Sequence, residues 1–273
     1  MVNEFKTLKC HKSYYYCLKK LELAESIQIH KAKCPQCNAD LQAEFRFCPK
    51  CGQERIKPKE TLKDVFTSFL GDYFAYDSKL SLSIKPLLFK PGFLSLQYMK
   101  GIRVRYISPL RLYIFISILF FILLNWSGNS PLAGSSADAI MWNDFFHDYL
   151  PKIFFLLLPL FAGLLTLMHK KLKLGYVFHL IVSLHFHAFL FFLLSVYLLL
   201  SKFIAFIGYS NLNIFILSAF IGWILLYLLF DLKRIYRLSW KASIMRFILL
   251  LVLYGVILFL VMITILGYIT LKT

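Results

Sequence analysis

The stretch 176-YVFHLIVSLHFHAFLFFLLSVYLLL-200 decides the fold, because it contains no Asp, Glu, Lys or Arg. A helix needs about 20 predominantly apolar residues to cross the hydrocarbon core of a bilayer. Residues 176–200 are therefore predicted to span a membrane. Four more apolar runs of spanning length lie around this one, at 110–126, 151–168, 212–230 and 246–269, and none of the five contains Asp or Glu.

The composition agrees with this interpretation and excludes several classes of protein. Hydrophobic residues make up 59% of the 273 residues, the mean hydropathy is +0.66 and 16% of the residues are charged, whereas soluble domains carry about 25%. A soluble enzyme, a disordered chain and a secreted disulfide scaffold are excluded. The predicted fold is an all-α integral membrane protein with about five transmembrane helices, preceded by amphipathic interfacial helices and a small N-terminal zinc ribbon.

Basic residues alternate between the segments that connect the five runs. They are frequent before the first run, between the second and third, and between the fourth and fifth. The segment after the first run has none, and the segment after the third has only Lys202. Cytoplasmic loops carry the excess of Lys and Arg, and residues 1–20 lack the apolar region of a signal peptide. We therefore expect the N-terminus in the cytoplasm and the C-terminus on the opposite side.

Two Cys-x-x-Cys knuckles, CPQC at 34–37 and CPKC at 48–51, lie upstream of the apolar runs. Two such turns close a tetrahedral Zn²⁺ site, and paired cysteines in the cytoplasm are typical of metal sites rather than disulfides. Gly52 allows the positive φ that ends such a turn, and Phe45 and Phe47 are expected to form a miniature core beside the metal. We predict one structural zinc ion, bound by Cys34, Cys37, Cys48 and Cys51. The alternative is that these cysteines are redox-active thiols.

The composition also divides the chain into segments. A basic segment, 1–33, whose Cys10 and Cys17 are interpreted as free thiols, precedes the zinc ribbon at 34–52 and a charged linker at 53–60. The segment 61–109 has apolar residues at helical spacing with Lys and Asp between them, which is typical of helices on a membrane surface. A soluble helical cap packed on the zinc ribbon is the other possibility. Residues 110–273 form the predicted transmembrane bundle.

Basic residues at the start of the first run form a second candidate site, which consists of Arg103, Arg105 and Arg111. Basic residues near an anionic leaflet each contribute about 1 kcal/mol, so we expect these arginines to contact anionic lipid headgroups. A specific phosphate or headgroup site is the alternative, because guanidinium groups bind phosphate through two hydrogen bonds. The formal net charge of +17 is attributed to topology and anionic lipid, and nucleic acid is not expected as a partner.

Three histidines lie inside the run 176–200, namely His179, His185 and His187. Ionisable residues within a membrane raise functional hypotheses, so these three are candidates for catalysis, proton handling or metal binding. On a straight helix His185 and His187 point about 200° apart and cannot share one metal ion. The simpler interpretation is that they are neutral histidines hydrogen-bonded within the bundle.

Three parts of the chain together resemble the bacterial family called domain of unknown function 3667: the two knuckles, the stretch from Pro91 to Tyr113, and the histidine-containing run. The chain departs from the family pattern at Ile102, where a basic residue is usual, and at Phe178, where Glu usually precedes the histidine. The resemblance implies a bacterial inner-membrane protein with an N-terminal zinc ribbon and no assigned activity. In such a membrane, the alternation of basic residues described above predicts a periplasmic C-terminus. The matching residues are Cys34, Cys37, Cys48, Cys51, Pro91, Gly92, Tyr98, Gly101, Arg103, Tyr106, Pro109, His179, His185 and His187.

Two functional hypotheses follow from these features. The favoured one is a non-enzymatic scaffold, adaptor or transport-associated protein, in which the zinc ribbon binds a cytoplasmic protein partner and the arginines contact anionic lipid. The alternative is a membrane enzyme or carrier for a lipid or small molecule, which would act through the intramembrane histidines and the interfacial arginines. The alternative is the weaker hypothesis, because the predicted runs contain neither a recognised catalytic spacing nor an intramembrane carboxylate.

Overall fold

The computed structural model describes residues 33–34, 36–41, 47–53, 62, 78–127 and 149–272. These residues belong to two compact units. The ribbon unit contains the described residues up to Gln53 and the segment 97–104, and the helical unit contains 62, 78–96 and everything from Arg105 onward. The unit boundary therefore passes through the predicted segment 61–109, of which 61 and 63–77 lie outside the described residues.

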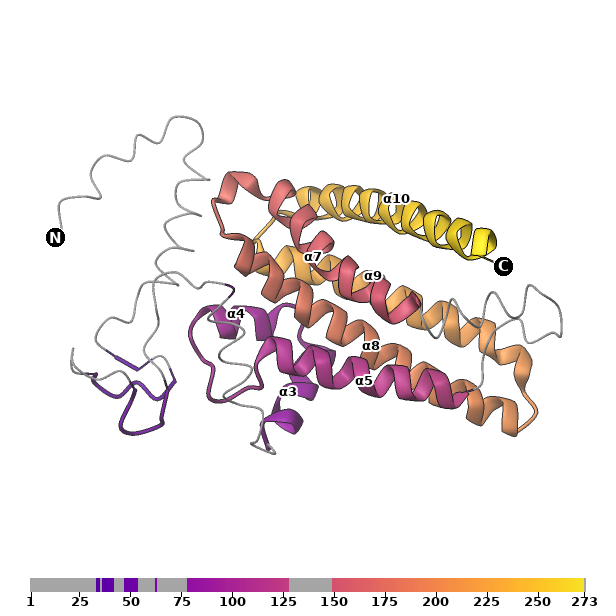
Figure 1. Cartoon of the computed structure of the whole chain (residues 1–273). Helices are drawn as coiled ribbons and strands as arrows, with labels where there is room; N and C mark the ends of the chain where they lie inside the picture. Colours follow the sequence, from indigo (N-terminus) through magenta and orange to yellow (C-terminus); the bar gives the residue numbers. More distant parts are fainter. Residues whose placement is uncertain are drawn as a thin grey trace. The chain divides into compact units, whose positions relative to one another are not determined.

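Five long apolar helices make up most of the helical unit (Figure 1): α5 Pro109–Ser127, α7 Leu150–Met168, α8 Tyr176–Phe206, α9 Asn213–Ile235 and α10 Trp240–Lys272. Each is long and apolar enough to cross a membrane, which confirms the predicted number of spans. The protein is thus a multi-pass membrane protein. Its described part contains no named strand, and Lys33 and Asp40 form an isolated antiparallel bridge.

The helices extend beyond some of the predicted apolar runs. α8 continues to Phe206 rather than 200, and α10 begins at Trp240 rather than 246. A helix continues until its backbone is capped, whatever the polarity of its last turns. At the end of α8 the cap is Gly208, with a φ of +81°, whose N–H donates to Ala205 O while Tyr209 N–H donates to Ile204 O.

Helix α8 lies at the centre of this unit. It packs against α5, α7 and α9, while α10 packs against α7 and α9. Phe191 of α8 is fully buried, and its ring centroid lies 5.0 Å from that of Phe120 on α5 and 4.8 Å from that of Phe154 on α7. Such contacts hold membrane helices together, because van der Waals packing rather than the hydrophobic effect drives their association.

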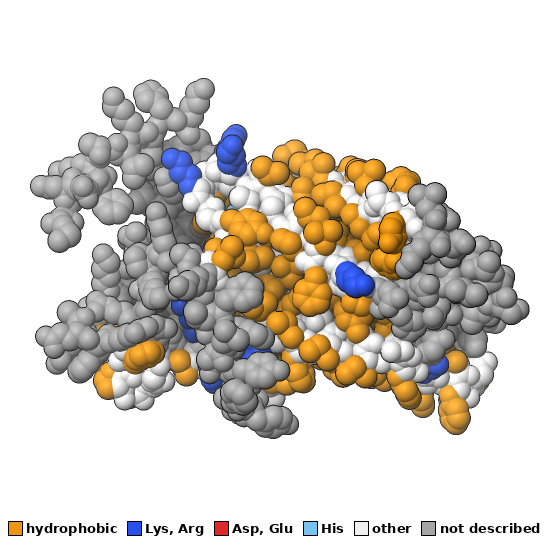
Figure 2. All heavy atoms as spheres, viewed as in Figure 1, with side chains coloured by type: hydrophobic (Ala, Val, Ile, Leu, Met, Phe, Trp, Pro, Cys, Tyr) orange, Lys and Arg blue, Asp and Glu red, His pale blue; other side chains and the backbone are white. Residues whose placement is uncertain are grey.

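The outer surface of the helical unit is mostly apolar. Figure 2 shows hydrophobic side chains over much of the described surface, with few Lys or Arg among them. Helices α9 and α10 have many exposed apolar side chains, including those of Phe215, Val252 and Phe259, which are 57–69% exposed. Exposed apolar surface on this scale is expected of helices that contact lipid.

Two short helices, α3 Ser78–Phe89 and α4 Phe93–Met99, precede α5. The turn between them, Pro91-Gly92, lies against the end of α9. Gly92 has a φ of +69°, and a Cβ there would lie 2.8 Å from Ile235 Cγ1 and 3.3 Å from Asp231 Oδ1. The N–H of Gly92 donates to the Asp231 carboxylate. Glycine is therefore needed at this position for two reasons: it adopts the positive φ, and its lack of a side chain lets the turn lie close to α9.

Two more hydrogen bonds join this region to α9. Tyr227 O–H donates to Leu87 O over 2.7 Å, and Arg234 Nη1 donates to Pro91 O over 3.2 Å. α3 also contacts α8. The part of the segment 61–109 that belongs to the helical unit thus packs on the long helices, and the part at 97–104 belongs to the ribbon unit.

Candidate metal centre and buried histidines

The two cysteine knuckles have the same backbone geometry. In the first, Cys34 N–H donates to Ala39 O and Asn38 N–H donates to Cys34 O; in the second, Cys48 N–H donates to Gln53 O and Gly52 N–H donates to Cys48 O. Asn38 and Gly52 hold equivalent positions, with φ values of +57° and +72°. Gly and Asn are the residues that adopt this left-handed conformation most readily. The positive φ expected at Gly52 is therefore present.

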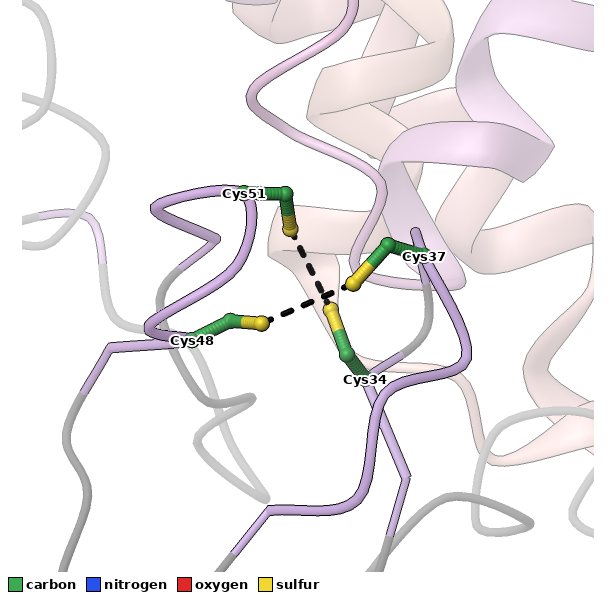
Figure 3. A group of neighbouring side chains, drawn as sticks. All are labelled: Cys34, Cys37, Cys48 and Cys51. Carbon is green, nitrogen blue, oxygen red and sulfur yellow. Dashed lines mark hydrogen bonds between the residues drawn. The ribbon is translucent and has the colours of Figure 1, made fainter.

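The knuckles bring four thiols together (Figure 3). The Sγ atoms of Cys34 and Cys51 are 3.5 Å apart, as are those of Cys37 and Cys48, and all four lie within 4.8 Å of one another. A tetrahedral ion with metal–sulfur bonds of about 2.3 Å requires sulfurs about 3.8 Å apart. The four side chains therefore fit one tetrahedral metal ion, and they would fill all its coordination positions.

The thiols differ in how easily they ionise. Burial, with the neighbouring thiols, raises the pKa of Cys51 to about 12 although the backbone of Gln53 lowers it. At Cys48 burial acts in the same direction, but hydrogen bonds from the backbone of Lys50 and Cys51 and from neighbouring thiols lower the pKa to about 7. A metal ion must therefore displace protons as it binds, which is the ordinary behaviour of thiolate sites.

The core of the ribbon differs from the prediction. Leu41 packs with the cysteines and with Ala39, whereas Phe47 is 52% exposed; Phe45 lies outside the described residues. Phe47 directly precedes Cys48, whose side chain must point at the metal site, and successive side chains in an extended segment point to opposite faces. The alternation therefore turns Phe47 outward.

Gln53, the residue after the second knuckle, joins the ribbon to the segment 97–104 within the same unit. Its side chain is 1% exposed, and its Oε1 accepts hydrogen bonds from Arg103 N–H over 3.0 Å and Val104 N–H over 3.1 Å. Sequence reasoning missed this residue, since it had been assigned to a linker. The one sequence feature that points to it is its position directly after Gly52.

The three candidate arginines are distributed over both units. Arg103 belongs to the ribbon unit, where its guanidinium lies over the ring of Tyr98 at 4.8 Å from the centroid. Arg105 belongs to the helical unit and lies 5.8 Å from the centroid of the Tyr106 ring. Arg111 is half-buried in the first turns of α5. Arginine and tyrosine thus pair at two neighbouring positions of the chain by cation–π contact.

His179 is bound into a buried aromatic cluster at the end of the helical unit. Its Nδ1 lies 2.7 Å from the hydroxyl oxygen of Tyr236, and the ring of His169 stacks on Tyr236 with centroids 3.6 Å apart. Burial, helped by the charge of Asp231, raises the pKa of Tyr236 well above its ordinary value. The hydroxyl therefore stays protonated and can donate to His179.

His185 and His187 contact different elements, consistent with the angle between them on the helix. His185 Nδ1 lies 3.0 Å from Ser95 Oγ of α4, and His187 Nε2 lies 3.2 Å from the hydroxyl oxygen of Tyr254 on α10. Ser183, one turn before His187, donates to Leu158 O of α7. All of these partners except Tyr254 are buried.

The hydrogen bonds determine which ring nitrogen carries the proton. His169, His185 and His187 each place Nδ1 within 3.1 Å of the carbonyl oxygen four residues earlier. A carbonyl oxygen only accepts, so Nδ1 is the donor and Nε2 carries no proton in each neutral ring. Within the part of the chain that the structure describes, the four cysteines are the one group of three or more potential ligands close enough to hold a metal ion.

Two segments of the chain match known family models. Residues 33–54 match a zinc-ribbon domain, and residues 77–121 match the family described as protein of unknown function (DUF3667). The matched segments contain the four cysteines and the candidate arginines, whereas the three α8 histidines lie outside them. Comparison with curated proteins and with solved structures found no match. The chain therefore combines a zinc ribbon with a segment similar to the DUF3667 family, which confirms the resemblance predicted from its sequence.

Proposed function

We propose that this protein is a membrane-anchored scaffold or adaptor of the bacterial cytoplasmic membrane, whose zinc ribbon binds a cytoplasmic protein partner. The observation that carries the proposal is the closed four-thiol site. With all coordination positions filled by protein, a metal ion there has no position for a substrate or water and serves to hold the fold. A ribbon of this kind presents a surface rather than a reactive centre.

Zinc is the metal that this site fits best. Four thiolates are soft ligands, and a tetrahedral set of sulfurs is typical of zinc or of iron–sulfur chemistry. Among the described residues, the ribbon core consists of Leu41, Ala39 and the cysteines themselves. We therefore expect most of the free energy of folding to come from the metal, since structural zinc sites supply about 10–16 kcal/mol. One zinc ion per chain is therefore proposed.

The proposed orientation rests on the ends of the helices. The start of α5 and the connections α7–α8 and α9–α10 lie at one end of the helical unit (Figure 1). That end carries Lys170, Lys171 and Lys173 in one connection and Lys233, Arg234 and Arg237 around the other, whereas 207–212 has no basic residue. The excess of basic residues favours the cytoplasm for this end. Arg105 and Arg111 would then contact anionic headgroups from the cytoplasmic side, and the C-terminus would be periplasmic.

The test combines metal content with partner contact. Zinc is measured by elemental analysis in the detergent-purified full chain and in a variant with Ser at all four cysteine positions. A photo-reactive amino acid at the exposed Lys50 of the ribbon then reports contacts in cells, with the same group at the exposed Tyr209 between α8 and α9 as control. We expect one discrete protein adduct from position 50 that Cys34→Ser removes and that His185→Ala with His187→Ala retains.

Two results would reject the proposal. An adduct that persists in Cys34→Ser would show that the ribbon fold is not needed for the contact. Loss of a cellular phenotype in the histidine variant, with protein level and fold unchanged, would favour the enzyme or carrier alternative.

The proposed orientation has its own test. A membrane-impermeant thiol reagent should label Tyr209→Cys in intact cells and should not label Lys171→Cys.

A further inference from the structure

We infer that metal binding by the ribbon controls the conformation of Arg103 and Val104, at the end of the segment 97–104, and that Gln53 is the residue that makes the link. This inference rests on the proposed zinc ribbon and describes how that same site is regulated. Residues 97–104 end α4 and lead along the chain to the first spanning helix at Pro109. Metal occupancy would thereby determine the conformation of the two residues that follow the end of α4 and its cap.

The link is a partly buried pair of hydrogen bonds between the two parts of the ribbon unit. Gln53 Oε1 accepts from two consecutive N–H groups, those of Arg103 and Val104, over 3.0 and 3.1 Å. An amide oxygen has two lone pairs and can accept both. Neither N–H lies in a helix. A partly buried N–H that loses its acceptor has to bond to water or to another group, so loss of the Gln53 oxygen should move this part of the chain or expose it to water.

The metal determines where Gln53 lies. The backbone of Gln53 closes the second knuckle, because its carbonyl oxygen accepts the N–H of Cys48 over 2.8 Å, and Cys51, a ligand, lies two residues before it. Among the described residues, the apolar side chains that pack with the cysteines are those of Leu41 and Ala39, which is too small a core to hold this turn without the metal. Small metal domains of this kind fold only when the ion is bound. Removal of the ion therefore releases Gln53.

The segment itself is otherwise held by local contacts. Gly101, with a φ of +82°, ends α4: its N–H donates to Tyr98 O, and Ile102 N–H donates to Gln97 O. These bonds form a Schellman cap that involves neither the ribbon nor a metal. The two N–H groups that follow the cap are those that Gln53 holds, so the metal-dependent part of the segment is confined to Arg103 and Val104.

The experiment is hydrogen–deuterium exchange on the full chain in detergent, followed in peptides that cover Arg103 and Val104. The zinc-loaded protein, the protein after chelation, and the variants Gln53→Met and Gln53→Glu are compared. Met has a similar length but no acceptor, whereas Glu retains the oxygen. Gln36→Met is the matched control, because Gln36 lies on the first knuckle and its Oε1, unlike that of Gln53, accepts no hydrogen bond from the described residues.

We expect exchange at these amides to rise about tenfold on chelation and in zinc-loaded Gln53→Met, which corresponds to the loss of about one hydrogen bond per amide. Gln53→Glu and Gln36→Met should exchange like the wild type, and Gly101 should stay protected throughout. If Gln53→Met retains one zinc ion and its amides exchange at the wild-type rate, the inference is wrong while the zinc ribbon stands. If the wild-type chain binds no zinc, the proposed function fails first.

Discussion

The ribbon unit and the helical unit hold their buried polar groups in opposite ways. In the ribbon, the paired sulfurs belong to residues 17 and 11 positions apart in the chain. In the helical unit, His179, His185 and His187 contact residues 57, 90 and 67 positions away. The first arrangement needs only two local turns and an ion, whereas the second needs the helices to be packed before any contact can form.

The difference shows that the two units should respond to different perturbations. Removal of the metal should unfold the ribbon and leave the helices in place, since none of their described contacts involves a thiol. A steric change between helices should lower the stability of the helical unit and leave zinc bound. Four predictions test this separation, from the largest expected effect to the smallest.

Cys34→Ser should abolish zinc binding, because three thiolates cannot complete the tetrahedral site. Elemental analysis of the purified chain should find about one zinc ion in the wild type and none in the variant. The helical content, measured by far-UV circular dichroism, should change little. Cys17→Ser is the matched control, and loss of zinc in that variant would contradict the assignment of the ligands.

Acidification should release the metal before it disturbs the helices. Zinc binding displaces protons from thiols, so affinity falls as the pH falls and rises as it rises. Chelator competition between about pH 7.5 and pH 5.5 should show zinc binding that weakens steadily towards the acidic end. Zinc affinity that does not change over this range would exclude thiolates as the ligands.

Gly92→Ala should destabilise the helical unit without removing zinc. The added Cβ would lie 2.8 Å from Ile235 Cγ1, and the alanine would have to adopt a φ of +69°. We therefore expect the free energy of unfolding to fall by about 2–4 kcal/mol. Thermal unfolding in detergent measures it. The control is Gly163→Ala in α7, where the new Cβ meets nothing within 4 Å and helix propensity favours Ala by up to about 1 kcal/mol. Equal stability of the two variants would rule out the close contact between Gly92 and α9.

Tyr236→Phe should lower the stability of the helical unit more than Tyr254→Phe does. Tyr236 bonds to His179 over 2.7 Å within fully buried surroundings, whereas Tyr254 bonds to His187 over 3.2 Å and is only half-buried. Buried hydrogen bonds between membrane helices contribute about 0.6–1.7 kcal/mol, so we expect about 1 kcal/mol at Tyr236 and less at Tyr254. Thermal unfolding of both variants tests the order, and a reversed order would contradict the geometry.

Local spacing in the sequence was enough to predict several features. The five apolar runs predict five spanning helices, because crossing a bilayer demands a length and polarity that few other segments meet. The two knuckles predict the four-thiol site, because their ligands lie three residues apart on single turns. The positive φ at Gly52 follows from the same turn geometry.

Other features depend on residues that are distant in sequence. Nothing near His179 in the sequence points to Tyr236. The position of Gln53 after Gly52 draws attention to that residue but does not indicate that it binds the amides of Arg103 and Val104. Phe47 was expected in the ribbon core because it is aromatic, yet the direction of the chain before Cys48 turns it outward. The sequence shows Pro91-Gly92 only as part of the family pattern, whereas the structure shows that Gly92 lies against Asp231 and Ile235.

The sequence by itself therefore determined the class of the protein, the number of its candidate spans and the four cysteines of its candidate metal site, because these depend on the length, polarity and spacing of neighbouring residues. The tertiary structure alone decided the partners of the histidines, the role of Gly92 and the link made by Gln53. Each of those depends on which surfaces meet, and close packing lets a side chain 50 or more positions away supply the one acceptor or the one space that a site requires.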